Sequence, residues 1–113
     1  MVSNCVFCKI INGDIKSDVV YETEDVLAIR DVAPQAPHHY LIIPKLHIPT
    51  SQDVRDPSIW ANLMEVLTIV AQRMGLVDSG YRVVINCGSQ ACQSIFHLHL
   101  HLLSGRKFGW PPG

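Results

Sequence analysis

The sequence has little net charge, no long apolar run and few cysteines. Lys and Arg total 9 against 10 Asp and Glu in 113 residues, which leaves a net charge of −1. No basic stripe is present, so binding to polymeric nucleic acid is not expected. No apolar run approaches the roughly 20 residues of a membrane span, and the first 12 residues have no signal-peptide core. We therefore expect a protein of the cytoplasm or nucleus with no membrane partner.

The length and composition indicate one compact domain. A chain of 113 residues, 48% of them apolar, can bury its own core but leaves no room for a second domain. We expect a single domain over residues 1–113. The four cysteines, in a protein that is not exported, are better interpreted as thiols or metal ligands than as a disulfide framework.

The order of apolar runs and turn residues predicts an α+β fold. A helix is expected to begin at Asp56-Pro57, where Asp can cap the backbone and Pro suits the first turn, and to end at Gly75. Its apolar residues recur at spacings of three and four, as on one buried helix face. The other predicted elements are a short helix over 5–12, a hairpin of 18–21 with 26–30, and strands over 39–44, 81–85 and 95–103. Together they form an antiparallel sheet of about five strands with one long helix packed on a face.

The run His97-Leu98-His99-Leu100-His101 is the most informative stretch. If it is a strand, its side chains alternate, so the three imidazoles share one face. Phe96 and the leucines are then expected to point into the core. Imidazole can act as a nucleophile, a general acid or a hydrogen-bond donor to phosphate oxygens near neutral pH. Three histidines in strict alternation therefore indicate a site, whereas a single exposed histidine would not.

The chain resembles the histidine-triad (HIT) superfamily, in its histidine-triad nucleotide-binding, protein kinase C inhibitor-like branch. The resemblance begins with His-x-His-x-His followed by two apolar residues and preceded by 93–96. It extends over nearly the whole chain, through the stretches 7–11, 31–37, 41–45, 80–84 and Trp110-Pro-Pro-Gly113. It implies a HIT-like fold and chemistry on nucleotides.

The resemblance also implies a catalytic role for each matching residue. His99 would attack the α-phosphorus and carry the nucleotidyl group. His101 would hold phosphate oxygens, and Ser94 would hydrogen-bond near the scissile nitrogen. His39 and His97 would form a proton relay behind the nucleophile.

The nucleotide-binding residues follow from the same resemblance. Asp31 would accept both ribose hydroxyls, Val32 would pack on the base, and Asn86 would contact the sugar and phosphate. The loop 86–94 also offers backbone N–H groups that can cradle a phosphate. Cys92 stands where close relatives carry glycine, so its side chain could narrow the phosphate site. The predicted nucleotide-binding residues are Asp31, Val32, Asn86, Cys92, Gln93, Ser94, His99 and His101.

A zinc site is predicted at the amino-terminal end. Cys5 and Cys8 have the spacing of a zinc knuckle, but two thiolates leave a tetrahedral ion short of two ligands. Several relatives pair such cysteines with histidines that correspond to His47 and His97. In that arrangement His97 cannot also be a free proton relay, and the relay role belongs chiefly to His39. The alternative is that both cysteines are apolar helix residues and His47 lies in an ordinary loop.

The expected function is a purine nucleoside phosphoramidase, an adenosine 5′-monophosphoramidase-like hydrolase that binds AMP or GMP. Alternatives are a dinucleoside polyphosphate hydrolase, a nucleotide-binding scaffold with vestigial catalysis, and a metal-binding module. The resemblance further implies a homodimer, with the long helix and a strand edge at its interface and Trp110 reaching the partner's active site. No organic cofactor is expected.

Overall fold

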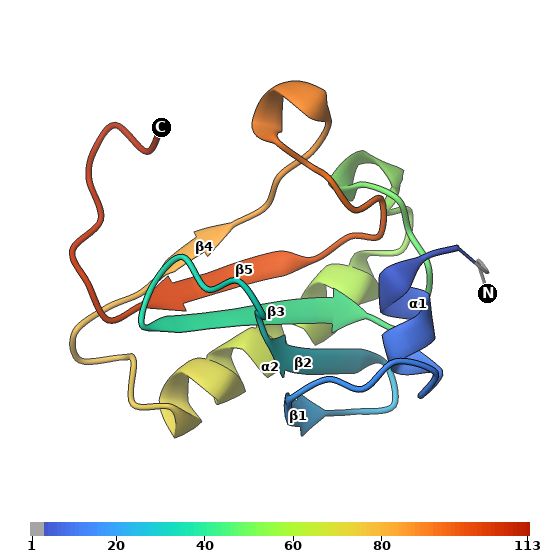
Figure 1. The fold of residues 1–113 in the computed structure, drawn as a ribbon, viewed down its shortest axis with the longest axis horizontal. Coiled ribbons are helices and arrows are strands. Elements are labelled where there is room, and N and C mark those ends of the chain that lie inside the picture. Colours follow the sequence, from blue (N-terminus) through green and yellow to red (C-terminus); the bar gives the residue numbers. More distant parts are fainter. Residues whose placement is uncertain (1–3) are drawn as a thin grey trace.

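The structure, a computed structural model, describes residues 4–113. One antiparallel sheet of five strands, in the order β1-β2-β3-β5-β4, runs through the middle of the domain (Figure 1). The expected five-stranded α+β fold is therefore confirmed. The elements are α1 (Val6–Ile11), β1 (Val19–Glu22), β2 (Val26–Arg30), β3 (His38–Pro44), α2 (Pro57–Arg73), β4 (Arg82–Val84) and β5 (Leu100–Ser104), with 3₁₀ turns at Ser51–Asp53 and Ser89–Ala91.

The long helix α2 begins and ends where the sequence predicts. The Asp56 carboxylate accepts the Ser58 N–H at 2.9 Å, and Pro57 occupies the first turn. Gly75 follows the helix with φ +71°, a left-handed conformation that glycine adopts without strain. No helix within residues 4–113 is long and apolar enough to cross a bilayer.

The two faces of the sheet are covered unequally. Alternate residues of β2, β3 and β5, such as Ala28, Ile42 and Leu100, pack against α2 in the main core. The intervening residues, such as Ile29 and Leu41, pack against the short helix α1. Because α1 is only six residues long, it leaves part of this second face open. His39 and His101 lie on this face, so the fold places a site beside α1.

The predicted strand 95–103 is wrong in its first half. Strand β5 begins at Leu100, and residues 95–99 follow an irregular path before it. The Leu98 N–H donates to the Ile48 carbonyl at 2.6 Å rather than to a neighbouring strand. The leucines are buried as expected, but Phe96 is 53% exposed, so its expected place in the core is also wrong. Despite the irregular path, Leu98, Leu100 and Leu102 all lie in the core beside α2, while the rings of His97 and His99 both pack against Phe7 of α1.

Candidate active site and metal centre

A cavity of about 460 Å³ opens between α1, the end of β2 and the 86–94 loop. Most of the predicted nucleotide residues line it: Asp31, Val32, Asn86, Cys92, Ser94, His99 and His101. Phe7, Ile10 and Ile29 supply an apolar wall that the sequence analysis did not identify. The cavity therefore combines an apolar side with a polar end, as small-molecule sites do.

Gln93 has a different position from the one expected. Its side chain is buried; its amide oxygen accepts the Gly88 N–H at 2.9 Å, and its amide nitrogen donates to the carbonyls of Pro49 and Ile95. These bonds hold the 86–94 loop against the rest of the domain. Gln93 is not among the residues that line the cavity. Gln93 therefore fixes the conformation of the 86–94 loop without facing the cavity.

Hydrogen bonding determines which nitrogen of His99 is available. Its Nδ1–H donates to the His97 carbonyl at 2.8 Å, so the lone pair of a neutral ring lies on Nε2. The ring packs edge-on against Phe7 with centroids 5.0 Å apart. Burial lowers the pKa of His99, although the His97 carbonyl and the charge of Asp31 act in the opposite direction. A neutral imidazole in this orientation is a competent nucleophile.

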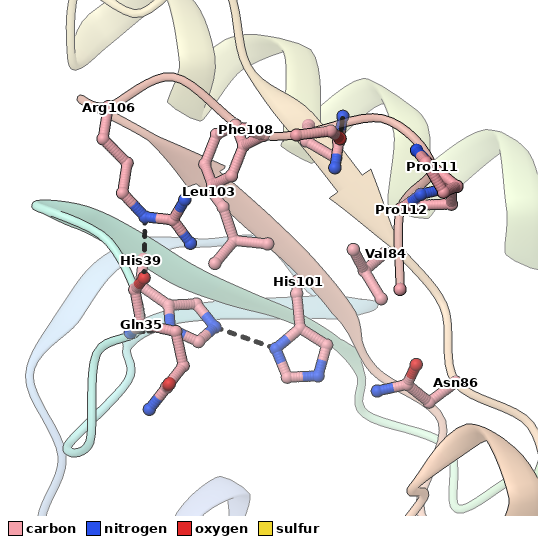
Figure 2. Close-up of a pocket in the computed structure, with 13 residues that line it drawn as sticks. Gln35, His39, Val84, Asn86, His101, Leu103, Arg106, Phe108, Pro111 and Pro112 are labelled. Carbon is pink, nitrogen blue, oxygen red and sulfur yellow. Dashed lines mark hydrogen bonds between the residues drawn. The ribbon is translucent and has the colours of Figure 1, made fainter.

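A chain of hydrogen bonds fixes the tautomers of His39 and His101. The Gln35 N–H donates to Nδ1 of His39 at 3.0 Å, so His39 carries its proton on Nε2. That Nε2–H donates to Nδ1 of His101 at 2.8 Å, as Figure 2 shows, which leaves a proton on Nε2 of His101. Asp31 Oδ2 lies 3.4 Å from Nε2 of His39. The strands thus supply His101 as a neutral donor beside the lone pair of His99.

The pKa values of both rings favour this neutral state. Burial lowers the pKa of His101 to about 4, with the nearby His99 and His39 adding to the shift. Burial also lowers the pKa of His39, against the opposing charge of Asp31. Both rings are therefore uncharged at neutral pH.

We expect the melting temperature to fall as the pH drops from about 6.5 to about 4. In this interval the unfolded chain protonates His101 at the ordinary histidine pKa of about 6.5, while the folded chain does not. The contribution of His101 to the free energy of unfolding is thus greatest above about pH 6.5, the pKa of the unfolded chain. It is lost as the pH falls toward about 4, the pKa of the folded chain. The ring is partly solvated, so we expect a loss of about 5 °C, roughly 1 kcal/mol in a domain of this size. Calorimetry of the native protein and of His101→Asn checks this, since the variant should lose less; equal losses would contradict it.

Cys92 has the only positive φ of a non-glycine residue within 4–113, at 63°. It ends the 3₁₀ turn Ser89–Ala91, and its N–H donates to the Ser89 carbonyl at 3.1 Å. The left-handed conformation costs a side-chain-bearing residue about 1–2 kcal/mol. The loop therefore retains a conformation that suits glycine while Cys92 lines the cavity.

We expect Cys92→Gly to raise the melting temperature by about 3 °C, because relief of the left-handed strain exceeds the entropy that glycine adds to the unfolded chain. Cys87→Gly is the matched control in the same loop. Cys87 has no positive φ, so this substitution relieves no strain; it adds entropy to the unfolded chain and removes the side-chain hydrogen bonds with Ser51 and Thr50, and it should lower the melting temperature. Thermal unfolding of both variants checks the opposite signs. If the melting temperature fell in both variants, glycine at position 92 would relieve no backbone strain.

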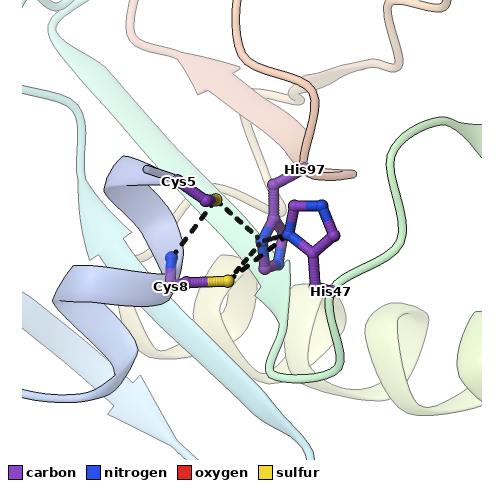
Figure 3. Close-up of side chains that lie close together, drawn as sticks. All are labelled: Cys5, Cys8, His47 and His97. Atoms are coloured by element: carbon purple, nitrogen blue, oxygen red, sulfur yellow. Dashed lines mark hydrogen bonds between the residues drawn. The ribbon is translucent and has the colours of Figure 1, made fainter. Parts of the chain in front are cut away.

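A second group of side chains, Cys5, Cys8, His47 and His97, converges beside α1 (Figure 3). Their ligand atoms all lie within 4.8 Å of one another. Individual separations are 3.3 Å from Cys5 Sγ to His97 Nδ1, 3.3 Å from Cys8 Sγ to His47 Nδ1, and 3.1 Å between the two Nδ1 atoms. A tetrahedral zinc with bonds of about 2.0–2.3 Å separates its ligand atoms by roughly 3.3–3.8 Å, close to these values.

The tautomer of His97 suits metal binding. Its Nε2–H donates to the Pro44 carbonyl at 2.8 Å, so the lone pair on Nδ1 faces the cysteines. His97 is fully buried, with its two ring nitrogens at the Pro44 carbonyl and the Cys5 thiol, whereas Nε2 of His39 bonds to His101. The structure thus separates the predicted relay: His39 lies against His101, and His97 lies with the cysteines.

Comparison with known proteins agrees with this geometry. The HIT domain family matches residues 12–108. The chain belongs to the HIT family. The 14 kDa zinc-binding protein of Zea mays is 50% identical to this chain over 98% of this chain and 89% of its own length. Adenylylsulfatase HINT1 of Arabidopsis thaliana is 44% identical over 98% of this chain and 78% of that protein.

Comparison with solved structures also confirms the HIT fold. A HIT family hydrolase from Legionella pneumophila Philadelphia 1 matches with a TM-score of 0.94 and 50% identity, covering 97% of this chain and 100% of that one. The resemblance deduced from the histidine run is therefore correct. Within this HIT chain, His97 of the triad faces the cysteines, and His99 and His101 line the cavity of about 460 Å³.

Proposed function

We propose that this HIT protein is a purine nucleoside phosphoramidase that acts through a nucleotidyl intermediate on His99. The observation that carries the proposal is that the hydrogen bonds of His99 and His101 fix complementary tautomers of these two rings in one cavity. His99 presents an Nε2 lone pair because its Nδ1–H is held by the His97 carbonyl. His101 presents an Nε2–H because its Nδ1 accepts from His39. A nucleophile and a phosphate-oxygen donor thus line the same cavity.

The reaction would proceed in two displacements. Nε2 of His99 forms a bond to the α-phosphorus as the phosphorus–nitrogen bond breaks, and the electron pair leaves on the amine nitrogen. That nitrogen takes up one proton from solvent water, with the Ser94 hydroxyl as its hydrogen-bonding neighbour. Water then attacks the phosphorus, releases His99 and returns one proton, so that nucleoside monophosphate and free amine are the products. Throughout, the Nε2–H of His101 would stabilise charge on the phosphate oxygens.

The rest of the cavity would hold the nucleoside. The Asp31 carboxylate accepts the Ala33 N–H at 2.8 Å, which fixes its orientation at the end of β2. It would accept the two ribose hydroxyls. Val32 is 98% exposed and adjoins the apolar wall, so that burying it under a purine ring would be favourable. Asn86 and the loop N–H groups would contact the sugar and phosphate.

The cluster of Cys5, Cys8, His47 and His97 would hold a structural zinc ion, in agreement with the name of the Zea mays relative. All four positions are occupied by protein atoms, so the ion has no open position for substrate. Its contribution is to join α1 to the segment that carries His99.

Other leaving groups are compatible with the same nucleophile. The Arabidopsis thaliana relative is named an adenylylsulfatase, which removes sulfate rather than an amine. A dinucleoside polyphosphate hydrolase would likewise use His99, and a nucleotide-binding scaffold would use the cavity alone. Ser94 and the Trp110-Pro-Pro-Gly113 segment favour the phosphoramidase. Trp110 is 83% exposed, which supports the further proposal that it reaches a second copy in a homodimer.

Trapping the intermediate tests the proposed function. The protein is mixed with an adenosine 5′-phosphoramidate, quenched in denaturant without acid, digested and examined by mass spectrometry. We expect an adenylyl group on the peptide that contains His99, located on that residue by fragmentation. Turnover with the adenylyl group on another residue, or with no adduct under conditions that preserve phosphohistidine-type bonds, would contradict the proposal.

A further inference from the structure

A second cavity, of about 420 Å³, lies beside the cluster of cysteines and histidines. Cys5 and His47 of the cluster line it, together with Ser94 and Phe96, and we call it the metal-side cavity. Of the two cysteines in the cluster, only Cys5 lines this cavity, because Cys8 lies deeper with 1% of its surface exposed. The metal-side cavity therefore gives small molecules from solvent a path to one sulfur of the cluster.

The two sulfurs of the cluster lie close to each other on the first turn of α1. Cys5 and Cys8 are both present as thiols, and their sulfur atoms are within 4.8 Å of each other. The Cys8 N–H donates to Cys5 Sγ at 3.4 Å, which holds the Cys5 side chain over the start of the helix. A disulfide has an S–S bond of about 2.05 Å, so the two sulfurs need to approach by less than about 3 Å to form one. Cysteines with this C-x-x-C spacing form reversible disulfides in thiol–disulfide oxidoreductases.

The same two sulfurs supply half of the ligands in the cluster. Zinc binds the thiolate form of cysteine, and a disulfide has no thiolate to offer. The two remaining ligands, His47 and His97, would leave a tetrahedral ion two ligands short. Formation of a disulfide between Cys5 and Cys8 would therefore release the ion.

The contacts that orient the nucleophile begin at this cluster. Phe7 lies between the two cysteines in the sequence, and its ring packs against the rings of His97 and His99, with centroids 5.8 and 5.0 Å apart. The His97 carbonyl accepts the Nδ1–H of His99 at 2.8 Å. Release of the ion would free α1, which carries Phe7, and the ring of His97 at the same time. Because Phe7 also lines the nucleotide cavity, a chemical change at the sulfurs would alter that cavity.

We propose that Cys5 and Cys8 are an oxidation site for small hydroperoxides, and that their disulfide weakens nucleotide binding by releasing zinc. This inference rests on the zinc ion of the proposed function and does not depend on the phosphoramidase activity. Cys5 reacts first, because it lines the metal-side cavity and Cys8 does not.

The oxidation proceeds in two steps. The Cys5 thiolate attacks one oxygen of hydrogen peroxide, the O–O bond breaks, and the other oxygen takes up a proton and leaves as water, which gives a sulfenic acid. The Cys8 thiolate then attacks the Cys5 sulfur, and the sulfenic oxygen takes up a second proton and leaves as water. The two sulfurs lose two electrons and the peroxide gains them.

A chain that keeps only these two cysteines tests the proposal. Cys87 and Cys92 are exposed, and a hydrogen bond with the Ser51 side chain lowers the pKa of Cys87, so Cys87→Ser with Cys92→Ser removes the competing thiols. One equivalent of hydrogen peroxide should release one zinc ion per chain, followed with a chromophoric chelator against a sample without peroxide. Peptide mapping should find the Cys5–Cys8 disulfide in this variant and in the native protein.

Binding and stability measurements follow the consequences of oxidation. The dissociation constant for AMP, measured by calorimetry, should rise about tenfold in the oxidised protein. Its melting temperature should fall by about 10 °C, as in protein stripped by a chelator. A dithiol reductant added together with zinc should restore both values.

Two phenylalanine variants test the route of the peroxide. Phe96 lines the metal-side cavity and is 53% exposed, so Phe96→Ala should widen the path to Cys5 and speed zinc release about threefold. Phe108→Ala is the matched control, because Phe108 packs against two arginines and does not line this cavity. Its rate of zinc release should equal that of the parent chain. Equal rates in the two variants would contradict attack on Cys5 through the metal-side cavity.

The remaining outcomes separate this inference from the proposed function. Zinc that stays bound after peroxide, zinc release without the Cys5–Cys8 disulfide, or an unchanged AMP affinity in the oxidised protein would overturn the oxidation site as a control of nucleotide binding. Protein purified without zinc would contradict both the zinc ion and this inference. None of the measurements uses hydrolysis, so a failure of the phosphoramidase proposal would leave their results unchanged.

Discussion

His99→Ala is expected to lower kcat/KM for an adenosine phosphoramidate by at least about 10³-fold, as loss of a covalent nucleophile does in other hydrolases. Neither of the other two triad histidines can replace it. The Nδ1 of His101 accepts from His39, and its remaining nitrogen carries a proton, while His97 faces the cysteines. Steady-state kinetics with the variant and the native protein checks the loss.

Nucleotide binding should survive the same substitution. Asp31, Val32, Ile10 and Ile29 form no ring contact with His99, and only Phe7 of the apolar wall packs against its ring. The dissociation constant for AMP should therefore change by less than about tenfold, or about 1.4 kcal/mol. His38→Ala is the matched control: His38 lies on β3 but bonds to the Tyr40 hydroxyl at 2.8 Å and does not line the nucleotide cavity. Its activity should stay near the native level. Hydrolysis by His99→Ala within tenfold of the native rate would exclude His99 as the nucleophile.

The secondary structure could be predicted well because local signals and tertiary packing agree. The cap at Asp56, the spacing of apolar residues in α2 and the glycine at 75 lead to the observed helix. The prediction failed at 95–99, where alternating polar and apolar residues suggested a strand. Buried leucines such as Leu98 satisfy the alternation there, but the Leu98 N–H bonds to the Ile48 carbonyl outside the sheet. The alternation of polar and apolar residues in 95–99 thus predicted which side chains are buried, but it wrongly predicted that this segment pairs with a neighbouring strand.

The division of the triad could be predicted only in part. The cysteine spacing and the resemblance indicated that His97 belongs with a metal and His99 with a nucleotide. The partner of His39 was not predictable from spacing, because it depends on the register of β3 with β5. Leu41 lies opposite His101 and His39 lies opposite Leu103, so the two histidines are diagonal neighbours on one face. This register produces the 2.8 Å bond that sets the tautomer of His101.

The contact of Arg82 and Arg106 with Phe108 had no signal in the sequence. The two arginines lie on different segments, one on β4 and one after β5, so no local repeat relates them. They meet because β4 is the edge strand beside β5, and the chain that follows β5 places the Phe108 ring against both guanidinium groups. Such a contact depends on strand order, which local pattern does not reveal.

Removal of the metal is expected to have the largest effect on stability. Cys5→Ser with Cys8→Ser should reduce the zinc content from one per chain to near zero and lower the melting temperature by about 10 °C or more. The helix α1 has six residues, too few to be stable alone in water. Its cysteines connect it to His47 and His97. Metal analysis of protein purified without chelator, together with calorimetry, provides both measurements.

Two comparisons distinguish metal loss from the general cost of a buried serine. Cys87→Ser makes the same chemical change at an exposed cysteine outside the cluster and should leave zinc content and melting temperature unchanged. Native protein stripped by a chelator should lose the same stability as the double variant and regain it when zinc is added, which the variant should not. Substoichiometric zinc in the native protein, or an unchanged melting temperature in the double variant, would contradict the metal site. Because Phe7 and Ile10 of α1 also line the nucleotide cavity, loss of zinc should weaken AMP binding as well, and this coupling links the two sites through a single short helix.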